Sequence, residues 1–330
     1  MNWNRKELLR ACLQSLRRQE NVSFETIVVD NGSVDGSPEM AEREFGTQVI
    51  RNRENRGFCA ANNQGIAAAR GEFIALLNND AEAEPRWLAE MYRACTKSPD
   101  VGMAASKVLV WEDPGRIDKA GHLIFPDGQN RGRGTGEPDT GQYDREEEVL
   151  WPDGCAAMYR RSMLEQIGGF DEDFFAYGDD AELGLRGRIA GWKCMYAPGA
   201  VVRHHRGSTL GRQSRRRLEL IERNRLLLAI KHFPGSLLWL NGAYYAARIA
   251  AGIWAAMLGR GEAGQFQGVS GKLRMATALI RGDLEALTLA PRMWRKRREF
   301  EPLRKLTARE LKTVLRQHRI TLKELSQQSA

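Results

Sequence analysis

The sequence lacks paired cysteines and several common signatures. Its five cysteines are odd in number, scattered and never spaced as Cys-x-x-Cys: Cys12, Cys59, Cys95, Cys155 and Cys194. This pattern argues for a reducing compartment and against a disulfide framework or a zinc site. The chain has no internal repeat and does not open with a charged-then-apolar signal sequence. It also has no G-x-G-x-x-G, which argues against a dinucleotide-binding fold.

Charge is distributed unevenly along the 330 residues. The hydrophobic content of 42% and the charged content of 28% are ordinary for a globular protein and sufficient for a core. The length allows one large α/β domain and a smaller appendage. Residues 1–204 carry 25 Lys and Arg against 33 Asp and Glu, whereas residues 205–330 carry 25 against 9. Apolar residues interleave with these C-terminal cations, which favours an anionic membrane surface over nucleic acid as the partner.

The most informative stretch is GEFIALLNNDAEAEPRWL (71–88). Its apolar run, 73–77, is typical of a buried strand in a parallel sheet. Asn78, Asn79 and Asp80 follow directly, where α/β sheets bind their ligands. Their oxygen atoms suit a divalent metal that holds a phosphate. The alternative is a strand end capped by turn-forming residues.

This turn is similar to the metal-binding Asp-x-Asp turn of family 2 inverting glycosyltransferases, which have the GT-A fold. The first Asp of that signature is Asn78 here, so Asp80 alone supplies an anionic ligand. The resemblance covers residues 1–210 and implies an α/β catalytic domain with a mostly parallel sheet flanked by helices. Residues 211–330 would then form a basic, amphipathic, helical extension that associates with membranes.

Two further stretches resemble the donor-binding side of this family. IVVDNGSVDGS (27–37) places Asp30 and Asn31 at a strand end where the family binds the nucleobase or ribose, although a plain Asn-Gly turn is the alternative. In NRENRGFCAANNQG (52–65), the resemblance implies diphosphate contacts from Arg56, Gly57 and Asn62, with ordinary helix capping as the alternative for Asn62. The implied donor-binding set is Asp30, Asn31, Arg56, Gly57, Asn62, Asn78, Asn79 and Asp80.

The segment from Trp151 to Thr209 resembles the acceptor side of the family. An acidic pair precedes an amphipathic helix there, and its second member is the catalytic base. Asp180 matches that base and Asp179 the residue that orients it, although two acids at a helix start can also be a simple cap. His204 matches an additional metal ligand better than His205 does, so Asp80 and His204 would hold Mg²⁺ or Mn²⁺. The other histidines, His122, His232 and His318, are expected at the surface or in packing.

The first residues resemble the end of a central strand. Residues 1–4 look like its tail, with the body missing, so we expect the reading frame to continue upstream with apolar, β-rich residues. Residues 112–149 show little periodicity and are expected to form a mobile loop on the acceptor side.

The C-terminal third suggests helices and no catalytic residues. We expect an amphipathic helix in the membrane interface over 236–258, with Arg248 snorkelling to the polar side. A transmembrane span and a helix packed on the catalytic domain are the alternatives. Thr307 with Glu310 and Thr321 with Glu324 predict two capping boxes.

The resemblance implies transfer of a sugar, with inversion, from a nucleotide-diphosphate donor to a hydroxyl. The leading donor is dTDP-L-rhamnose and the alternative is UDP-hexose, including galactofuranose. The expected acceptor is a lipid-linked glycan at the cytoplasmic face of the membrane, where the protein would be peripherally bound. A catalytically dead paralogue that binds glycans or membranes as a partner subunit is the alternative from a different class.

Overall fold

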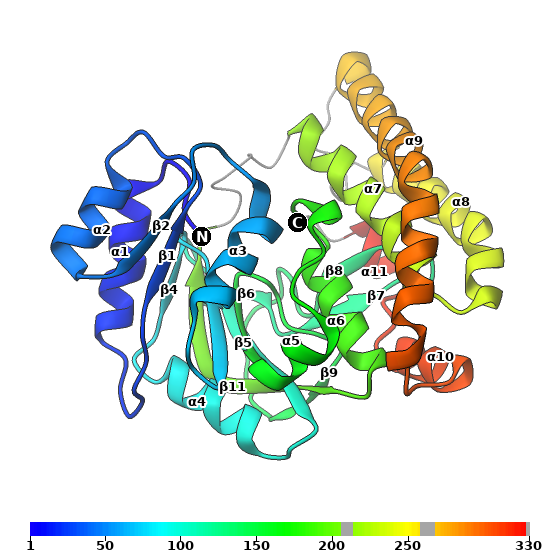
Figure 1. Ribbon diagram of the computed structural model, residues 1–330. Helices are drawn as coiled ribbons and strands as arrows, with labels where there is room; N and C mark the ends of the chain where they lie inside the picture. Colours follow the sequence, from blue (N-terminus) through cyan, green and yellow to red (C-terminus); the bar gives the residue numbers. More distant parts are fainter. Residues whose placement is uncertain (206–213, 258–267, 328–330) are drawn as a thin grey trace.

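The computed structural model describes residues 1–205, 214–257 and 268–327. Figure 1 shows most of the strands with their covering helices on one side and a group of long helices on the other. All five cysteines are free and buried.

The N-terminal part alternates helices with two parallel strands. Its elements are α1 (Lys6–Arg17), β1 (Ile27–Asp30), α2 (Ser37–Phe45), β2 (Gln48–Arg51) and α3 (Gly57–Ala68). Asn2 forms a parallel bridge with Asp30, and its backbone N–H donates to the Val29 carbonyl at 2.8 Å. The first residues therefore lie beside β1, while continuation of the reading frame upstream stays a prediction.

The larger sheet has seven strands and is mixed. Its central order is β3 (Phe73–Leu77), β10 (Ala156–Arg160), β5 (Val101–Val110), β11 (Lys193–His204) and β4 (Ala81–Ala83). β6 (Ile117–Lys119) and β9 (Glu147–Val149) pair with β5 and β11. The expected α/β architecture is confirmed, but in this sheet only β5 and β11 pair in parallel. β10 runs antiparallel to β5 because the chain leaves the carboxyl end of β5 and enters β10 at that same end of the sheet.

Residues 112–149 are more regular than the sequence suggested. They contain β6, β9 and a separate hairpin of β7 (His122–Ile124) and β8 (Asn130–Gly132). The segment expected to be a mobile loop therefore contains regular structure, which the sequence did not show because three-residue strands are too short to give a periodic pattern.

The remaining helices pack on the sheet and on one another. They are α4 (Trp87–Thr96), α5 (Arg161–Ile167), η1 (Glu172–Phe174), α6 (Asp179–Ile189), α7 (Arg215–His232), α8 (Gly235–Met257), α9 (Gly268–Phe300), η3 (Glu301–Leu303), α10 (Ala308–Gln317) and α11 (Leu322–Gln327). α7 lies along α9, where a side chain at Gly282 would come within 2.6 Å of the Glu219 carbonyl. Both predicted capping boxes, at Thr307 and Thr321, are confirmed.

Helix α8 is anchored to the rest of the protein through Arg248. The guanidinium donates to Asp127 at 2.6 Å and to Glu222 at 2.8 Å, and Asn241 donates to the Asp127 carbonyl at 2.9 Å. Snorkelling of Arg248 to a membrane surface was therefore wrong, because these buried carboxylates already pair with it. None of the helices in the described ranges is long and apolar enough to cross a bilayer.

A buried charge network joins α6 to α7. Glu182 is fully buried and accepts hydrogen bonds from Arg186 at 2.9 Å and Lys231 at 2.7 Å, and it contacts His232 Nε2 at 2.9 Å. Although burial opposes ionisation, these cations hold the pKa of Glu182 well below its usual range. Burial lowers the pKa of His232 to about 4, despite its contact with Glu182.

We predict that acid weakens the fold through His232. Between pH 6.5 and about pH 4 the unfolded chain binds a proton at this residue and the folded chain does not, so the free energy of unfolding falls as the pH falls. The full difference is about 3 kcal/mol. Urea unfolding at several pH values should show a flatter dependence in His232→Gln, whose amide does not titrate. Equal pH dependence in both proteins would contradict the assignment.

Candidate functional site

A cavity of about 370 Å³ lies where β3 and β11 end and α6 begins. Seven of the residues expected from the sequence line it: Gly57, Asn78, Asn79, Asp80, Asp179, Asp180 and His204. The strand pairing explains why Asp80 and His204 meet. Ala81 of β4 pairs with His204 of β11, and the backbone N–H of His205 donates to the Asp80 carbonyl at 2.9 Å.

One wall of the cavity is an acidic corner around His204. Its Nε2 lies 3.5 Å from Asp80 Oδ1, and its Nδ1 lies 2.8 Å from Asp118 Oδ2. A carboxylate only accepts, so Nδ1 carries the proton. Burial lowers the pKa of His204, but the neighbouring carboxylates of Asp118 and Asp80 outweigh it and raise the pKa to about 9. The corner therefore carries enough negative charge to favour a cation.

This corner fits a divalent metal. Asp80 Oδ1 is buried and has no hydrogen-bond partner among the residues that the structure describes, and His204 Nε2 lies beside it. Asp118 on the far side of the ring is the carboxylate that usually orients a metal-bound histidine. Asp80 and His204 would hold the ion, with Asp118 fixing the ring. A histidine among oxygen ligands suits Mn²⁺ better than Mg²⁺.

The opposite wall is the acidic pair at the start of α6. Gly178 is the N-cap residue and has no side chain to cap the helix, but Asp180 Oδ1 accepts from the backbone N–H of Ala181 in the first turn at 2.8 Å, so the helix-cap alternative holds in part. Asp180 Oδ2 also accepts from the backbone N–H of Gly154 at 3.3 Å. Burial and the charge of Asp180 raise the pKa of Asp179 well above its usual range. Burial also raises the pKa of Asp180, but His122 and Lys119 act against it, so Asp180 is the member that more readily stays ionised.

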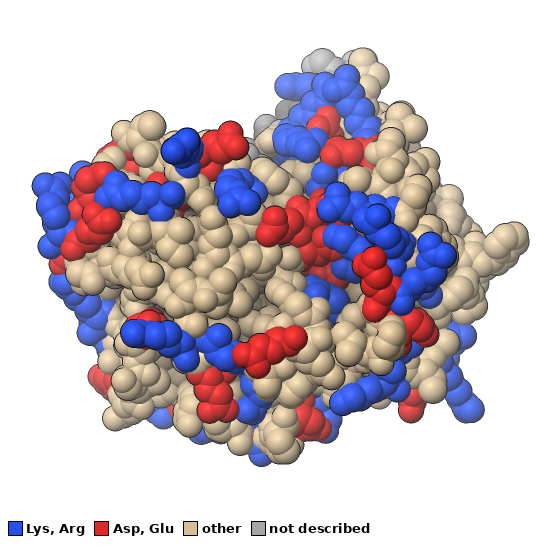
Figure 2. All heavy atoms as spheres, viewed as in Figure 1, with Lys and Arg blue, Asp and Glu red and all other residues tan. Residues whose placement is uncertain are grey.

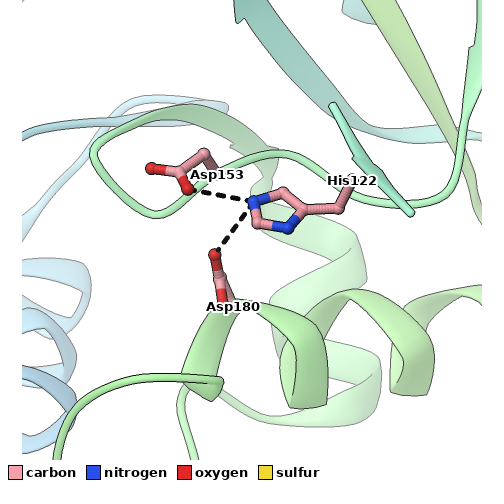
Figure 3. Close-up of side chains that lie close together, drawn as sticks. All are labelled: His122, Asp153 and Asp180. Atoms are coloured by element: carbon pink, nitrogen blue, oxygen red, sulfur yellow. Dashed lines mark hydrogen bonds and ion pairs between the residues drawn. The ribbon is translucent and has the colours of Figure 1, made fainter. Parts of the chain in front are cut away.

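Three residues outside the predicted set surround Asp180. His122 Nε2 lies 2.9 Å from Asp153 Oδ2 and 3.6 Å from Asp180 Oδ2, so it sits between the two carboxylates (Figure 3). Lys119 forms an ion pair with the same Asp153 oxygen. Although burial opposes ionisation, Lys119 and His122 hold the pKa of Asp153 well below its usual range. His122 is thus a buried site residue and not the surface or packing residue expected.

The sequence carried a weak signal for this group. Asp153 lies in the stretch that resembles the acceptor side, but His122 is 31 residues earlier, in the segment taken for a loop. The ligand atoms of His122, Asp153 and Asp180 lie within 4.8 Å of one another, close enough for a cation. Lys119 already supplies positive charge there, whereas the Asp80 corner has a buried oxygen without a partner. The Asp80 corner is therefore the better candidate for the metal.

Gly57 marks a close approach at the start of α3. Its φ is +85°, and a Cβ there would come within 2.5 Å of the Phe175 ring. The Phe175 carbonyl accepts from the backbone N–H groups of Phe58 at 2.7 Å and Cys59 at 3.2 Å. The N-terminus of α3 is thus capped by the loop that precedes the acidic pair.

The other expected donor contacts lie outside this cavity. The Asp30 carboxylate accepts from Asn2 and Ser33, and the Asn31 amide donates to the Gly57 carbonyl at 3.1 Å. Arg56 is exposed and does not line the cavity in the described part of the chain. Asn62 donates to the Phe58 carbonyl at 2.9 Å, within α3, so it does not cap the helix as the alternative supposed.

Helix α7 also forms part of the cavity wall, so the C-terminal third is not separate from the site. Asn224 lines the cavity and its amide donates to the carbonyls of Phe174 and Ala176 at 2.9 Å and of Tyr177 at 2.5 Å. Phe175 and Tyr177 have positive φ values of 62° and 67°, which are unusual for these residue types. Asn224 therefore helps to hold a strained loop that leads directly into Asp179.

Comparisons with known proteins find similar glycosyltransferases. A family model described as Glycosyl transferase family 2 matches residues 1–168. The N-acetylglucosaminyl-diphospho-decaprenol L-rhamnosyltransferase of Mycobacterium tuberculosis (strain H37Rv) is 28% identical over 228 residues, which cover 62% of this chain and 74% of that protein. The putative glycosyltransferase EpsH of Bacillus subtilis (strain 168) is 37% identical over 118 residues, 34% of each chain.

Two further matches concern length and fold. The uncharacterized protein y4gI of Sinorhizobium fredii is 31% identical over 228 residues. The aligned region covers 62% of this chain and only 24% of that relative. The mannosyltransferase PcManGT from Pyrobaculum calidifontis, solved with GDP-Man and Mn²⁺, superposes with a TM-score of 0.52 at 21% identity over 87% of this chain and 85% of that one. The expected GT-A fold is therefore confirmed. Since the family model matches just over half of the residues, the chain belongs to glycosyl transferase family 2.

Proposed function

We propose that this protein is an inverting glycosyltransferase that moves a sugar from a nucleotide-diphosphate donor to an acceptor hydroxyl. The observation that carries the proposal is that a cation-binding corner and an acidic pair line one cavity. Asp80 and His204 form the first, and Asp179 and Asp180 form the second.

In the proposed reaction the acceptor oxygen forms a bond to the anomeric carbon as the bond from that carbon to the diphosphate breaks. The bonding electron pair leaves with the diphosphate, and Asp180 takes the proton from the acceptor hydroxyl. His122 lies 3.6 Å from the Asp180 carboxylate and helps to keep it ionised for that role. A divalent cation bound by Asp80 and His204 would neutralise charge on the leaving diphosphate.

For the donor we propose dTDP-L-rhamnose, with UDP-hexose as the alternative. Support comes from the Mycobacterium tuberculosis relative, which is named as an L-rhamnosyltransferase, and from the sequence resemblance. The same name describes a diphospho-decaprenol acceptor, so a lipid-linked glycan is the proposed acceptor class here. A protein acting on such an acceptor would work at the cytoplasmic face of the membrane.

Calorimetric titration of TDP, UDP and GDP into the 330-residue chain, with Mn²⁺ present, tests the proposal. We expect one nucleotide to bind and the binding to vanish when a chelator is added. Transfer from the matching nucleotide sugar to a lipid-linked acceptor should then be measurable. A folded protein that binds none of the three nucleotides would overturn the enzyme assignment.

We predict that Asn224→Leu lowers turnover while leaving donor binding within a few fold. The substitution removes the amide that holds the loop before Asp179 and leaves three backbone carbonyls without that donor. Stability should fall by about 2 kcal/mol because a buried polar contact is lost, and turnover should fall by roughly tenfold or more as the acid pair moves out of position.

Asn241→Leu is the matched control for this variant. Asn241 is also a buried asparagine in the helical region, but it donates to the Asp127 carbonyl and does not line the cavity. It should lose similar stability and keep its turnover. Equal turnover in the two variants would show that Asn224 has only a structural role.

A further inference from the structure

The outer face of α8 is apolar along its described length. Trp239 is 88% exposed and Trp254 is 64% exposed, close to opposite ends of the helix. Between them the exposed positions hold only small or apolar residues: Leu240, Gly242, Ala243, Ala246, Ala247, Ala250 and Ile253. The inner face carries the polar groups, including Asn241 and Arg248, which are bonded to Asp127.

Helix α9 carries a second apolar stripe. Its exposed members are Leu273, Ile280, Leu284, Leu287 and Trp294. Of the thirteen large hydrophobic side chains exposed in the described ranges, nine belong to α8 and α9. Such a concentration on adjacent elements is typical of a binding surface and not of scattered exposed residues. We call the outer positions of these two helices the apolar surface.

A hydrogen bond joins the two helices. The Tyr245 hydroxyl of α8 donates to Asp283 of α9 at 2.7 Å. Figure 1 shows both helices on the side of the molecule away from β1 and β2. The apolar surface therefore lies on an outer side of the helical region.

Charge around the apolar surface has one dominant sign. Exposed cations on α9 flank the stripe: Lys272, Arg274, Arg281, Arg292, Arg295 and Arg298. α8 contains no acidic residue. The acids of α9 are engaged with neighbours, since Asp283 accepts from Tyr245, Glu285 pairs with Arg223 and Glu299 faces Arg295 at 3.6 Å. Figure 2 shows Lys and Arg gathered over α7 and α9.

We propose that the apolar surface docks on an anionic lipid bilayer, with α8 and α9 lying flat in its interface. Apolar stripes with tryptophans near helix ends and cations at the border match the depth profile of a bilayer interface. A protein partner would not require the charges around the apolar surface to share one sign, whereas an anionic bilayer favours cations there. The biological use of this docking rests on the proposed function. α9 packs along α7, and α7 lines the cavity. Docking would thus hold the cavity near a lipid-linked acceptor.

Sedimentation of the full chain with vesicles tests this without nucleotide or metal. We expect binding to vesicles that contain phosphatidylglycerol to exceed binding to pure phosphatidylcholine by roughly tenfold or more, and to weaken at high salt. Ile280→Glu and Trp239→Glu should each lower the anionic-vesicle affinity by about tenfold. Val34→Glu is the matched control, because Val34 is 91% exposed but lies far along the chain between β1 and α2; it should bind like the unchanged protein.

Three results would overturn the proposal. They are equal affinity for both vesicle types, stripe variants that behave like Val34→Glu, and light scattering that shows a dimer which only the stripe variants dissociate. Nucleotide titration of the same samples separates the two hypotheses. If the unchanged protein binds nucleotide but not vesicles, only the docking proposal is contradicted. If it binds vesicles but not nucleotide, only the enzyme assignment is contradicted.

Discussion

Asp180→Asn should reduce sugar transfer by about 10²- to 10⁴-fold, the range expected when a general base is removed. Nucleotide binding with Mn²⁺ should stay within a few fold, because Asp180 lies at the start of α6 and not in the corner formed by Asp80 and His204. The amide keeps the size of the carboxylate, so the fold should persist. Single-turnover transfer and calorimetric titration on the same preparation measure the two quantities separately.

Asp179→Asn is the sharpest control for this prediction. Burial and the neighbouring charge of Asp180 push the pKa of Asp179 well above its usual range, so its neutral form is favoured. An amide resembles that neutral form, and we expect turnover to fall far less than in Asp180→Asn. The opposite ranking would show that Asp179 is the base. Equal, small losses of turnover in both variants would show that neither acid is the general base.

Asp179 and Asp180 could be predicted from the sequence because the residues that identify this acidic pair lie close to it in the chain. Two acids directly before a helix, in a stretch with several matching neighbours, fix both the position and the partner of Asp180 within a few residues. The same holds for Asp80, which directly follows the apolar strand β3. The strand expected over 73–77 was found in the structure as β3, but it is a half-buried edge strand that pairs antiparallel with β10, not the buried strand of a parallel sheet that was expected.

Contacts that depend on tertiary pairing could not be found this way. His122 reaches Asp180 only because the β7–β8 hairpin folds beside α6, and three-residue strands leave no periodic pattern. Arg248 was read as a charge at a membrane surface because its partners, Asp127 and Glu222, are 121 and 26 residues away in sequence. Hydrophobicity along α8 indicated an apolar helix, but only the structure shows which face is buried.

The second large effect should come from the metal corner. We expect chelation to abolish nucleotide binding, and His204→Gln to weaken Mn²⁺-dependent binding by about 10- to 100-fold, as loss of a ligand or its supporting partner generally does. Asp80→Asn should do at least as much, because Asn78 and Asn79 leave Asp80 as the one anionic residue of that turn. Titration of nucleotide at several Mn²⁺ concentrations measures both effects.

His205→Gln provides the control for His204→Gln. The two residues are adjacent, but the His205 ring stacks on Trp111 at 4.3 Å, whereas the His204 ring lies between Asp80 and Asp118. The His205 variant should therefore keep metal-dependent binding. Asp118→Asn should have an intermediate effect, because it leaves both ligands in place and removes only the carboxylate that orients the ring. If His204→Gln and His205→Gln bound nucleotide equally well, the cation would have to be held elsewhere, and the His122, Asp153 and Asp180 group would be the next place to test.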